Sequence, residues 1–384
     1  MIRQFAVRPA RIAVVATPFG FGPASKAYTI TQVLTGSYGM SVHCYGADSA
    51  GDFFDAQDGV RARHISAGAL DREPGLLSGY DAIVNVLAPE LIRSRETAAA
   101  TYYVDSLGFM WQSADIPVDS PLKQVRGYFA QNVFGSVENL TALGVPGVRP
   151  VSGIVSAPAP APSADRAPDG PPARALVHLG GLGNPAGTGS AHAYLPLAER
   201  LLGALRDDGY ELTVAMNQAG SAFRLAGGGA VRQLSGTGFQ QALADCATVL
   251  SSPGLTTLIE TSQAGRPYVP LPPQNWSQVL ICEHMSRLSG QGVWPFLAGR
   301  YRAVDTRAAE AAKAAAVREI NRDLAADEGF LAEYGRLARR AAREGEVPTV
   351  GAPFGGAEEI ASVVAADLGV ARVTNDLSMN VGAR

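Results

Sequence analysis

Short apolar runs, glycine-containing loops and longer stretches with helical spacing follow one another along the chain. Near the N-terminus, residues 11–16 form an apolar run, residues 20–23 contain two glycines, and residues 24–34 carry apolar side chains at helical spacing. This order predicts a strand, a tight loop and a helix, which together begin a parallel β-α-β unit. Further strands are predicted at residues 41–45, 80–86 and 101–105.

The second half of the chain repeats this order of elements. Strands are predicted at residues 175–179, 211–216, 230–234, 248–251 and 267–270, with a helix at 194–207. Between residues 305 and 343, Ala, Glu, Lys and Arg recur at helical spacing and predict two surface helices. Because each half alternates strands with helices, the sequence predicts an α/β protein with two parallel-sheet domains that face each other.

A segment without large apolar side chains separates the two halves. Residues 156–173 read SAPAPAPSADRAPDGPPA and consist mostly of alanine and proline. Such a composition buries little surface and favours an extended chain. We therefore place the boundary between the two predicted domains in this segment.

Composition and charge exclude several classes of protein. The 384 residues are enough for two to three domains of roughly 150 residues. The net charge of −3 creates no positive field that would attract a phosphate backbone, so a nucleic acid is not expected as the main partner. Three widely separated cysteines fit neither a disulfide framework nor a zinc site. No apolar run approaches the roughly 20 residues that span a bilayer, and the N-terminal run leads into a glycine loop rather than a cleavage site. We expect a cytoplasmic protein without a transmembrane segment.

The stretch SPGLTTLIE combines a turn with the start of a helix. A predicted strand ends just before it, Gly254 lies in the turn, and Thr256 and Thr257 fall in the first turn of the helix. A helix start gathers unpaired N–H groups and a partial positive charge, and two hydroxyls add donors, so this segment suits a phosphate. Glu260, one turn further, can accept hydrogen bonds from the hydroxyls of a sugar attached to that phosphate. The stretch therefore predicts a site for a nucleoside diphosphate.

SPGLTTLIE and the following SQAGRPYVPLPPQNWSQ resemble the donor-site motif of the GT-B glycosyltransferases. The family pattern is a glycine, a glutamate six residues later, a G-x-P turn into a strand that ends in proline, and D-Q or an equivalent. These places are occupied by Gly254, Glu260, Gly265, Pro267, Pro270 and Gln278. The branch with MurG-type transferases and inverting natural-product glycosyltransferases is the most similar. VATPFGFGPASKAYTITQVL also resembles the acceptor-domain glycine loop, and VHLGGLGN the loop that opens the donor domain.

The resemblance implies the GT-B fold, with two Rossmann-like domains facing each other across a cleft. Residues 1–155 would bind the acceptor and residues 174–350 the nucleotide sugar, joined by the linker 156–173. Residues 351–384 would carry a last helix, over 355–368, back to the first domain. A nucleotide-sugar donor and a small-molecule acceptor would be the partners, no further cofactor is expected, and a homodimer is compatible with the pattern.

The resemblance also implies roles for residues of the second half. Gly254, Thr256 and Thr257 would hold the diphosphate. Glu260 would hold the ribose, and Gln278 would meet the hydroxyls of the donor sugar. The backbone around Gly236 and Phe239 would meet the base, and the loop with Gly180, Gly181 and Gly183 would approach the phosphates. The full set of residues predicted to bind the donor is Gly180, Gly181, Gly183, Gly236, Phe239, Ser252, Gly254, Thr256, Thr257, Glu260 and Gln278.

Two departures from the family pattern concern catalysis and phosphate binding. The acceptor-side glycine loop, with Gly20 and Gly22, contains no histidine, whereas many inverting members use one there as general base. Ser252 stands where relatives have a histidine or arginine that touches phosphate, and Ser277 stands where many have the aspartate of D-Q. The usual deprotonating group is therefore missing.

Candidates for the acceptor side lie at the ends of predicted strands, where clefts of open α/β sheets form. Asp105 closes the run TYYVD and is predicted to be the general base, with capping or loop hydrogen bonding as the alternative. Asn85 closes the run DAIVN and is predicted to contact the acceptor.

Histidine and aromatic residues leave two interpretations open. His43 and His178 lie inside predicted strands and are interpreted as core residues. His192 is a candidate for contact with the donor, His284 for a functional role on the helix after Gln278, and Trp276 for stacking or for packing a loop. Several aromatic and apolar residues lie near the glycine loop or near Asp105. They would either contact an acceptor with an apolar or aromatic face or pack in an ordinary core: Phe19, Phe21, Tyr102, Tyr103, Phe109, Met110 and Trp111.

Three functions remain under consideration from the sequence. The leading hypothesis is an inverting glycosyltransferase that acts on a small acceptor, such as a specialised metabolite. It is expected to be metal-independent, since no D-x-D triplet occurs in the chain and a helix start can stabilise the departing diphosphate. The alternatives are an epimerase or hydrolase acting on the nucleotide sugar itself, and a non-catalytic protein that binds the nucleotide sugar for another transferase.

Overall fold

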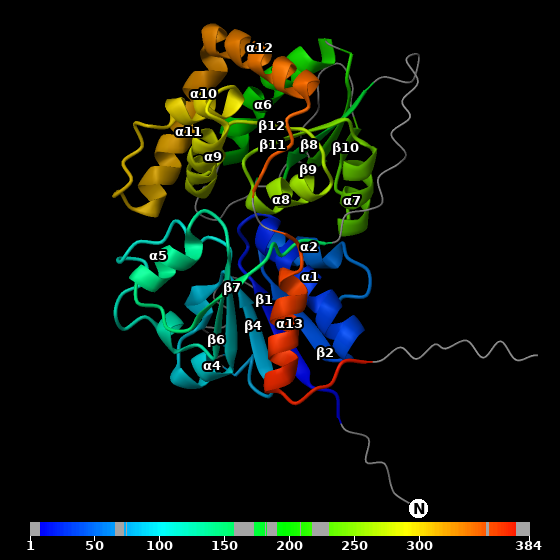
Figure 1. The fold of residues 1–384 in the computed structure, drawn as a ribbon, viewed down its shortest axis with the longest axis vertical. Helices are drawn as coiled ribbons and strands as arrows, with labels where there is room; N and C mark the ends of the chain where they lie inside the picture. The colour runs from blue at the N-terminus through cyan, green and yellow to red at the C-terminus, as the bar shows by residue number, and fades with distance from the viewer. Residues whose placement is uncertain are drawn as a thin grey trace, which may run out of the picture.

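The protein contains two parallel β-sheets, one built from each half of the chain (Figure 1). The computed structural model describes residues 8–65, 73, 75–156, 173–180, 182, 190–207, 209–216, 230–350 and 353–373. The predicted linker therefore lies almost wholly outside the described residues. Within them, no helix combines the length and apolar character needed to cross a bilayer.

The first sheet is formed by residues of the N-terminal half. Its strands are β1 (Arg11–Ala16), β2 (Ser41–Gly46), β3 (Ala62–His64), β4 (Ala82–Val86), β5 (Thr101–Asp105), β6 (Gly127–Gln131) and β7 (Val148–Val151). They are arranged in the order β3-β2-β1-β4-β5-β6-β7, and all neighbouring pairs are parallel. Its helices and short 3-10 turns are α1 (Gly22–Tyr38), α2 (Asp48–Asp55), η1 (Pro89–Leu91), α4 (Arg95–Ala100), η2 (Pro121–Gln124) and α5 (Ser136–Ala142).

The second sheet has the order β10-β9-β8-β11-β12, again with parallel pairs. Its strands are β8 (Arg174–Leu179), β9 (Glu211–Met216), β10 (Ala230–Arg232), β11 (Thr248–Ser251) and β12 (Tyr268–Pro270). The helices of this half are α6 (Ser190–Asp207), α7 (Gly236–Asp245), α8 (Leu255–Gln263), α9 (Trp276–Ser289), α10 (Val293–Arg300), α11 (Glu310–Ala326) and α12 (Glu328–Glu344).

Burial on both faces explains why the central strands read as apolar runs. Ile12, Val14 and Val15 of β1 are all but inaccessible to solvent, as are Val177 of β8 and Val249 of β11. Helices cover both faces of each sheet, so no alternation of polar and apolar residues is needed. The strands predicted around residues 11–16, 41–45, 101–105, 211–216 and 248–251 are confirmed, whereas the sequence analysis missed β3, β6 and β7.

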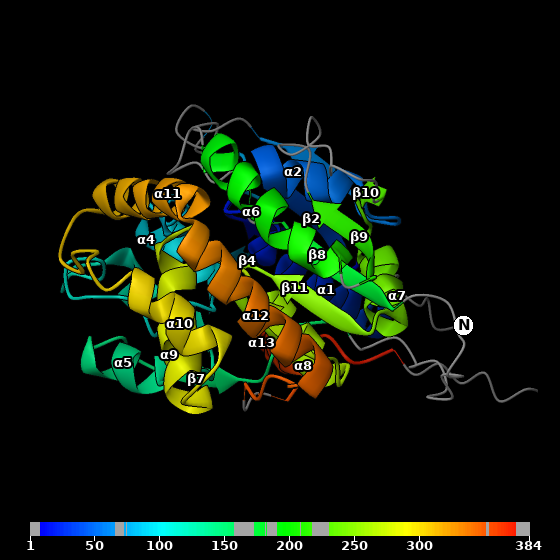
Figure 2. The same cartoon turned by 90° about the horizontal axis from the view of Figure 1, so that it is seen from above.

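The charged helices after residue 305 are only partly exposed. Both α11 and α12 contact α6 and cover the outer side of the second sheet (Figure 2). Val317 of α11 and Phe330 and Tyr334 of α12 are buried in the same core as β8 and β11. The prediction of two helices is confirmed, and one apolar face of each belongs to the core.

The last helix, α13 (Gly356–Asp367), returns to the first sheet and packs against α1 (Figure 1). Tyr102 of β5 donates a hydrogen bond of 2.8 Å to Asp367 at its end. The Ser152 hydroxyl, just after β7, donates a bond of 2.7 Å to Glu359 in its first turn. The chain therefore leaves the first sheet, builds the second and finishes on the first.

We expect Gly356→Ala to destabilise the protein, because α13 meets the end of β7 without space for a side chain. A Cβ at this position would lie 2.3 Å from the carbonyl oxygen of Ser152 and 2.9 Å from Cγ1 of Ile154. Relieving such overlap moves the main chain, at a cost of about 2 kcal/mol in the free energy of unfolding, which urea denaturation measures. The matched control is Gly36→Ala in α1, where no atom lies within 4 Å and a gain of up to about 1 kcal/mol is expected. Equal stability of Gly356→Ala and wild type would contradict this account of the junction.

Candidate functional site

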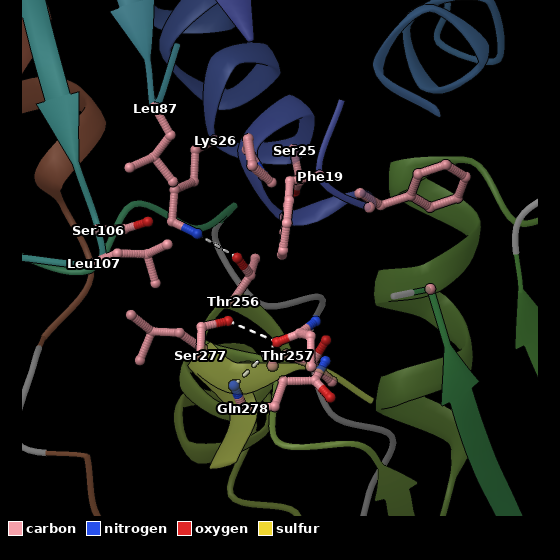
Figure 3. Close-up of a pocket in the computed structure, with 18 of the residues that line it drawn as sticks. Phe19, Ser25, Lys26, Leu87, Ser106, Leu107, Thr256, Thr257, Ser277 and Gln278 are labelled. Atoms are coloured by element: carbon pink, nitrogen blue, oxygen red, sulfur yellow. Dashed lines mark hydrogen bonds between the residues drawn. The ribbon is translucent and has the colours of Figure 1, made fainter. Parts of the chain in front are cut away.

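A cavity of about 600 Å³ lies between the two sheets (Figure 3). Residues that directly follow strands line it from both sides: Thr17 after β1, Leu87 after β4, Ser106 after β5, Gly180 after β8 and Ser252 after β11. The strands of each sheet run parallel, so their carboxyl ends meet at one edge, where open α/β sheets form clefts. The cavity is of the size that holds a small organic ligand.

Most of the described residues predicted for the donor and acceptor sides line this cavity. On the donor side these are Gly180, Gly236, Phe239, Ser252, Gly254, Thr256, Thr257, Glu260 and Gln278. Gly20 and Gly22 line it from the first half. Gly181, Gly183 and the side chain of His192 lie outside the described part of the chain.

The start of α8 opens into the cavity with its N–H groups available. Gly254 is the residue before the first turn and adopts an extended conformation, with φ −88° and ψ 124°. No side chain of the described residues caps this end of the helix. Thr256 and Thr257, in the first turn, line the cavity beside it. N–H groups, hydroxyls and the positive end of the helix dipole thus converge on one point, which suits an anion.

His178 supports Thr257 from the end of β8. Its Nδ1 lies 2.9 Å from Oγ1 of Thr257, and its ring lies 5.0 Å from the ring of Phe239, between centroids. Burial lowers the pKa of His178 to about 4, so the ring is neutral at pH 7. The prediction of a plain core residue is corrected, because His178 lines the cavity.

Glu260 lies one turn deeper on α8 and is 7% exposed. Its Oε1 accepts a hydrogen bond of 2.8 Å from the side-chain amide of Gln240. Burial raises the pKa of Glu260 to about 7, and the charge of Lys26 and the bond from Gln240 oppose that rise. Further hydrogen-bond donors from a ligand would therefore stabilise the charged form of this buried carboxylate.

Lys26 is the site residue that the sequence analysis missed. It lies on α1, is 2% exposed and lines the cavity. Its Nζ donates a hydrogen bond to Oγ1 of Thr256, on the other half of the protein (Figure 3). Burial lowers the pKa of Lys26 to about 8, and the charge of Glu260 opposes that shift. One signal was present in the sequence, since Lys26 is the single charged residue of the α1 segment GPASKAYTITQVLTGSY.

The first turn of α9 forms another part of the cavity wall. Asn275 caps this helix, since its Oδ1 accepts bonds of 3.1 Å from the N–H of Gln278 and 2.8 Å from the hydroxyl of Ser277. The side-chain oxygen of Gln278 accepts a bond of 2.7 Å from the N–H of Gln274. Ser277 thus completes the cap and lines the cavity.

Comparison with known proteins agrees with this arrangement at the level of the fold. No protein-family model and no curated protein matches the sequence. The structure of Os79 from O. sativa in complex with UDP is similar, with a TM-score of 0.51 and 12% identity over 92% of this chain and 99% of that chain. The fold is GT-B.

Two other GT-B structures are similar at lower TM-scores. Arabidopsis thaliana UGT89C1 in complex with UDP-L-rhamnose has a TM-score of 0.48 and 15% identity over 94% of this chain and 100% of that chain. A protein of Listeria monocytogenes assigned as a UDP-N-acetylglucosamine 2-epimerase has a TM-score of 0.47 and 11% identity, covering 94% and 97% of the two chains.

The predicted general base, Asp105, does not face the cleft of this GT-B protein. Its side chain is fully buried and accepts hydrogen bonds from the N–H of Leu107 at 2.7 Å, Nε1 of Trp111 at 2.7 Å and the hydroxyl of Tyr128 at 2.6 Å. Burial raises the pKa of Asp105, and these three bonds oppose the rise. The prediction is corrected: Asp105 bonds to the loop after β5 and to Tyr128 of β6, and it is not part of the cavity lining, to which Ser106 and Leu107 contribute instead.

Asn85 is corrected for the same reason. Its side chain is 1% exposed, donates to the carbonyl of Ala88 at 2.9 Å and accepts from the N–H of Ala88 at 2.9 Å. These two bonds close the turn after β4. That turn brings Leu87, rather than Asn85, to the cavity wall.

The remaining candidates do not themselves line the cavity. His284 of α9 stacks on Phe134, with centroids 4.8 Å apart. Trp276 is buried and has Nζ of Lys313 5.5 Å from its ring centroid, so the packing interpretation fits it. His43 lies 2.9 Å from the hydroxyl of Tyr80 on the far side of the first sheet.

Part of the wall contributed by the first half is apolar and aromatic. The apolar and aromatic side chains there are Phe19, Phe21, Phe53, Leu87, Leu107, Met110 and Trp111, and polar residues such as Ser25, Lys26 and Asp115 lie in the same half of the lining. Tyr102 and Tyr103, which the sequence analysis grouped with them, are buried in the core of the first half. The GT-B cleft thus joins a polar wall at α8 to an aromatic wall opposite.

Proposed function

We propose that the protein is a glycosyltransferase that moves a sugar from a nucleoside diphosphate sugar to a small molecule, inverting the anomeric centre. Residues 174–350 would form the donor domain and residues 1–155 the acceptor domain, joined by the linker 156–173, with residues 351–384 returning to the acceptor domain. The observation that supports this proposal is the single cavity that brings the start of α8 and Glu260 opposite an aromatic wall. Os79, whose structure contains UDP, shares the fold, so UDP is the first nucleotide to test.

The donor would lie along α8. The diphosphate would meet the N–H groups of the first turn, together with the hydroxyls of Thr256 and Thr257. The ribose hydroxyls would reach the carboxylate of Glu260, and the base would lie near Gly236 and Phe239. These groups stabilise negative charge that grows on the departing diphosphate, which lowers the barrier to direct displacement.

The acceptor would occupy the aromatic wall. Planar aromatic molecules pack well against Phe21, Phe53 and Trp111. A phenolic hydroxyl has a pKa of about 10 and gives up its proton more readily than an alcohol. Such an acceptor suits a cleft whose glycine loop supplies no histidine, and many specialised metabolites carry phenolic hydroxyls.

A turnover assay separates this proposal from its alternatives. The purified protein is incubated with UDP-glucose and other nucleotide sugars, with and without a panel of phenolic acceptors, and both nucleoside diphosphate and glycoside are quantified. We expect nucleoside diphosphate release only when an acceptor is present, a β-glycoside from an α-linked donor, and no loss of rate in EDTA.

Two results would overturn the proposal. Release of nucleoside diphosphate without an acceptor would indicate an epimerase or hydrolase. Tight binding of the donor without turnover with any acceptor would indicate a non-catalytic protein that binds the nucleotide sugar for another transferase.

A further inference from the structure

Lys26 connects the two halves of the protein at the site proposed for the diphosphate. It belongs to α1, which packs on the first sheet, whereas its partner Thr256 belongs to the first turn of α8 beside the second sheet. The two residues are 230 positions apart in the chain. A buried lysine of the acceptor half therefore contacts the anion-binding element of the donor half.

The ammonium of Lys26 is poorly satisfied where it lies. It has three N–H donors, and Oγ1 of Thr256 is the one hydrogen-bond acceptor that the described residues offer it. The positive end of the α8 dipole lies at the same place and repels a cation. Glu260 attracts it but lies deeper on α8, and the described residues contain no ion pair between the two. Burial of an ammonium under these conditions costs free energy that an anion would recover.

We propose that Lys26 holds the diphosphate of the donor from the acceptor side of the cleft, and so stabilises the leaving group. This inference rests on the proposed function and names a positioning and charge-stabilising residue within it. A diphosphate between Lys26 and the start of α8 would accept from both, replacing a repulsive contact with two attractive ones.

The group transfer leaves Lys26 protonated throughout. The acceptor oxygen forms a bond to the anomeric carbon while the bond from that carbon to the β-phosphate oxygen breaks, and its electron pair remains on the diphosphate. The proton of the acceptor hydroxyl passes to solvent. Negative charge increases next to Nζ of Lys26 as the bond breaks, so its stabilisation is greatest in the transition state.

The charges around Lys26 define how binding should depend on pH. Glu260 faces it from α8, and His178 of β8 is neutral above pH 5 because burial lowers its pKa to about 4. Asp115, Arg307, Glu310 and Lys313 line the cavity as well, on the loop after β5 and at the start of α11. Burial lowers the pKa of Lys26 to about 8, so a free site loses this charge as the pH rises through 8. Affinity for a diphosphate should fall above that pH.

The experiment measures binding of ligands with and without phosphate. UDP, dTDP, GDP, ADP, CDP, their nucleosides and inorganic pyrophosphate are titrated calorimetrically into wild type, Lys26→Met and the matched control Lys123→Met, whose lysine lies away from the cavity. We expect Lys26→Met to weaken the nucleoside diphosphate that binds by roughly 10- to 100-fold, the range of one charge-assisted hydrogen bond, with nucleoside affinity unchanged. The fall in affinity above pH 8 should disappear in Lys26→Met and in Lys26→Arg, whose guanidinium stays charged.

Each outcome bears on the inference separately from the proposed function. Equal loss of nucleoside and nucleoside diphosphate, or no loss of either, would overturn the role of Lys26 while leaving the transferase intact. If the wild type binds no nucleotide, the proposed function fails. Binding of pyrophosphate then tests whether Lys26 forms an anion site. Pyrophosphate binding that Lys26→Met removes would keep the anion site, and its absence would overturn it. Lys26→Gln provides the same comparison if Lys26→Met does not fold, as judged by thermal unfolding.

Discussion

Nucleoside affinity should fall by roughly 100-fold or more when Glu260 is replaced by alanine. The carboxylate lies buried on α8 and accepts one hydrogen bond, from Gln240, among the described residues. Two ribose hydroxyls would donate to it, and a hydrogen bond to a charged group contributes about 1.5 to 3 kcal/mol. Losing both accounts for this change in affinity. Turnover should fall at least as far, because the donor would no longer be positioned.

The pH dependence of nucleoside binding tests the same carboxylate. Burial raises the pKa of Glu260 to about 7, so the charged form that best accepts hydroxyls is present above pH 7 and lost below it. An uncharged nucleoside should bind more tightly at pH 8 than at pH 6. The folding contribution has the opposite sign: the folded protein holds a proton that the unfolded chain releases near pH 4.5, so stability decreases as the pH rises from about 4.5 to 7.

Calorimetry with ribonucleosides and 2′,3′-dideoxynucleosides measures how much the ribose hydroxyls contribute to binding. The wild type should prefer the ribonucleoside, and Glu260→Ala should bind both equally weakly. Glu319→Ala, an exposed glutamate of α11, is the matched control and should behave as the wild type. A preference for ribose that survives in Glu260→Ala would place the sugar elsewhere.

Replacing Asp105 by alanine should destabilise the protein severely rather than remove a chemical step alone. The substitution leaves three donors without an acceptor: the buried hydroxyl of Tyr128 and the half-buried N–H of Leu107 and Nε1 of Trp111. Each unsatisfied buried group costs about 1 to 3 kcal/mol and a half-buried one the lower part of that range, so a loss of about 3 to 5 kcal/mol in the free energy of unfolding is expected. The loop that carries Leu107, Met110 and Trp111 to the cavity would lose its anchor.

Urea denaturation and kinetics on the folded fraction together distinguish a structural role of Asp105 from a role as general base. Asp105→Asn keeps an oxygen that accepts part of the bonds, so it should lose less stability than Asp105→Ala and retain kcat where it is folded. Asp119→Asn, an exposed aspartate of the same half, is the control. A folded Asp105→Asn with kcat reduced by several orders of magnitude would restore Asp105 as the base.

Local sequence patterns predicted most of the fold and the cavity wall at α8. Apolar runs buried on both faces marked β1, β5 and β11, because a strand covered by helices on each side tolerates few polar residues. Gly254 and Glu260 belong to one turn and one helix, so their spacing in the chain fixes their spacing in space. Such features were readable from the sequence because they depend on neighbours only a few residues away.

Loop conformation and contacts between distant segments decided the rest. Asp105 and Asn85 do lie at strand ends, but the folded loops show that their side chains bond to Trp111, Tyr128 and Ala88 rather than face the cavity. Lys26 meets Thr256 because two separately built sheets pack with their carboxyl edges together, and no spacing in the chain encodes that contact. The sequence by itself determined two parallel-sheet halves and an anion-binding helix start. The tertiary structure decided which charges face one another across the cleft, because burial and desolvation act on the assembled surface rather than on the chain.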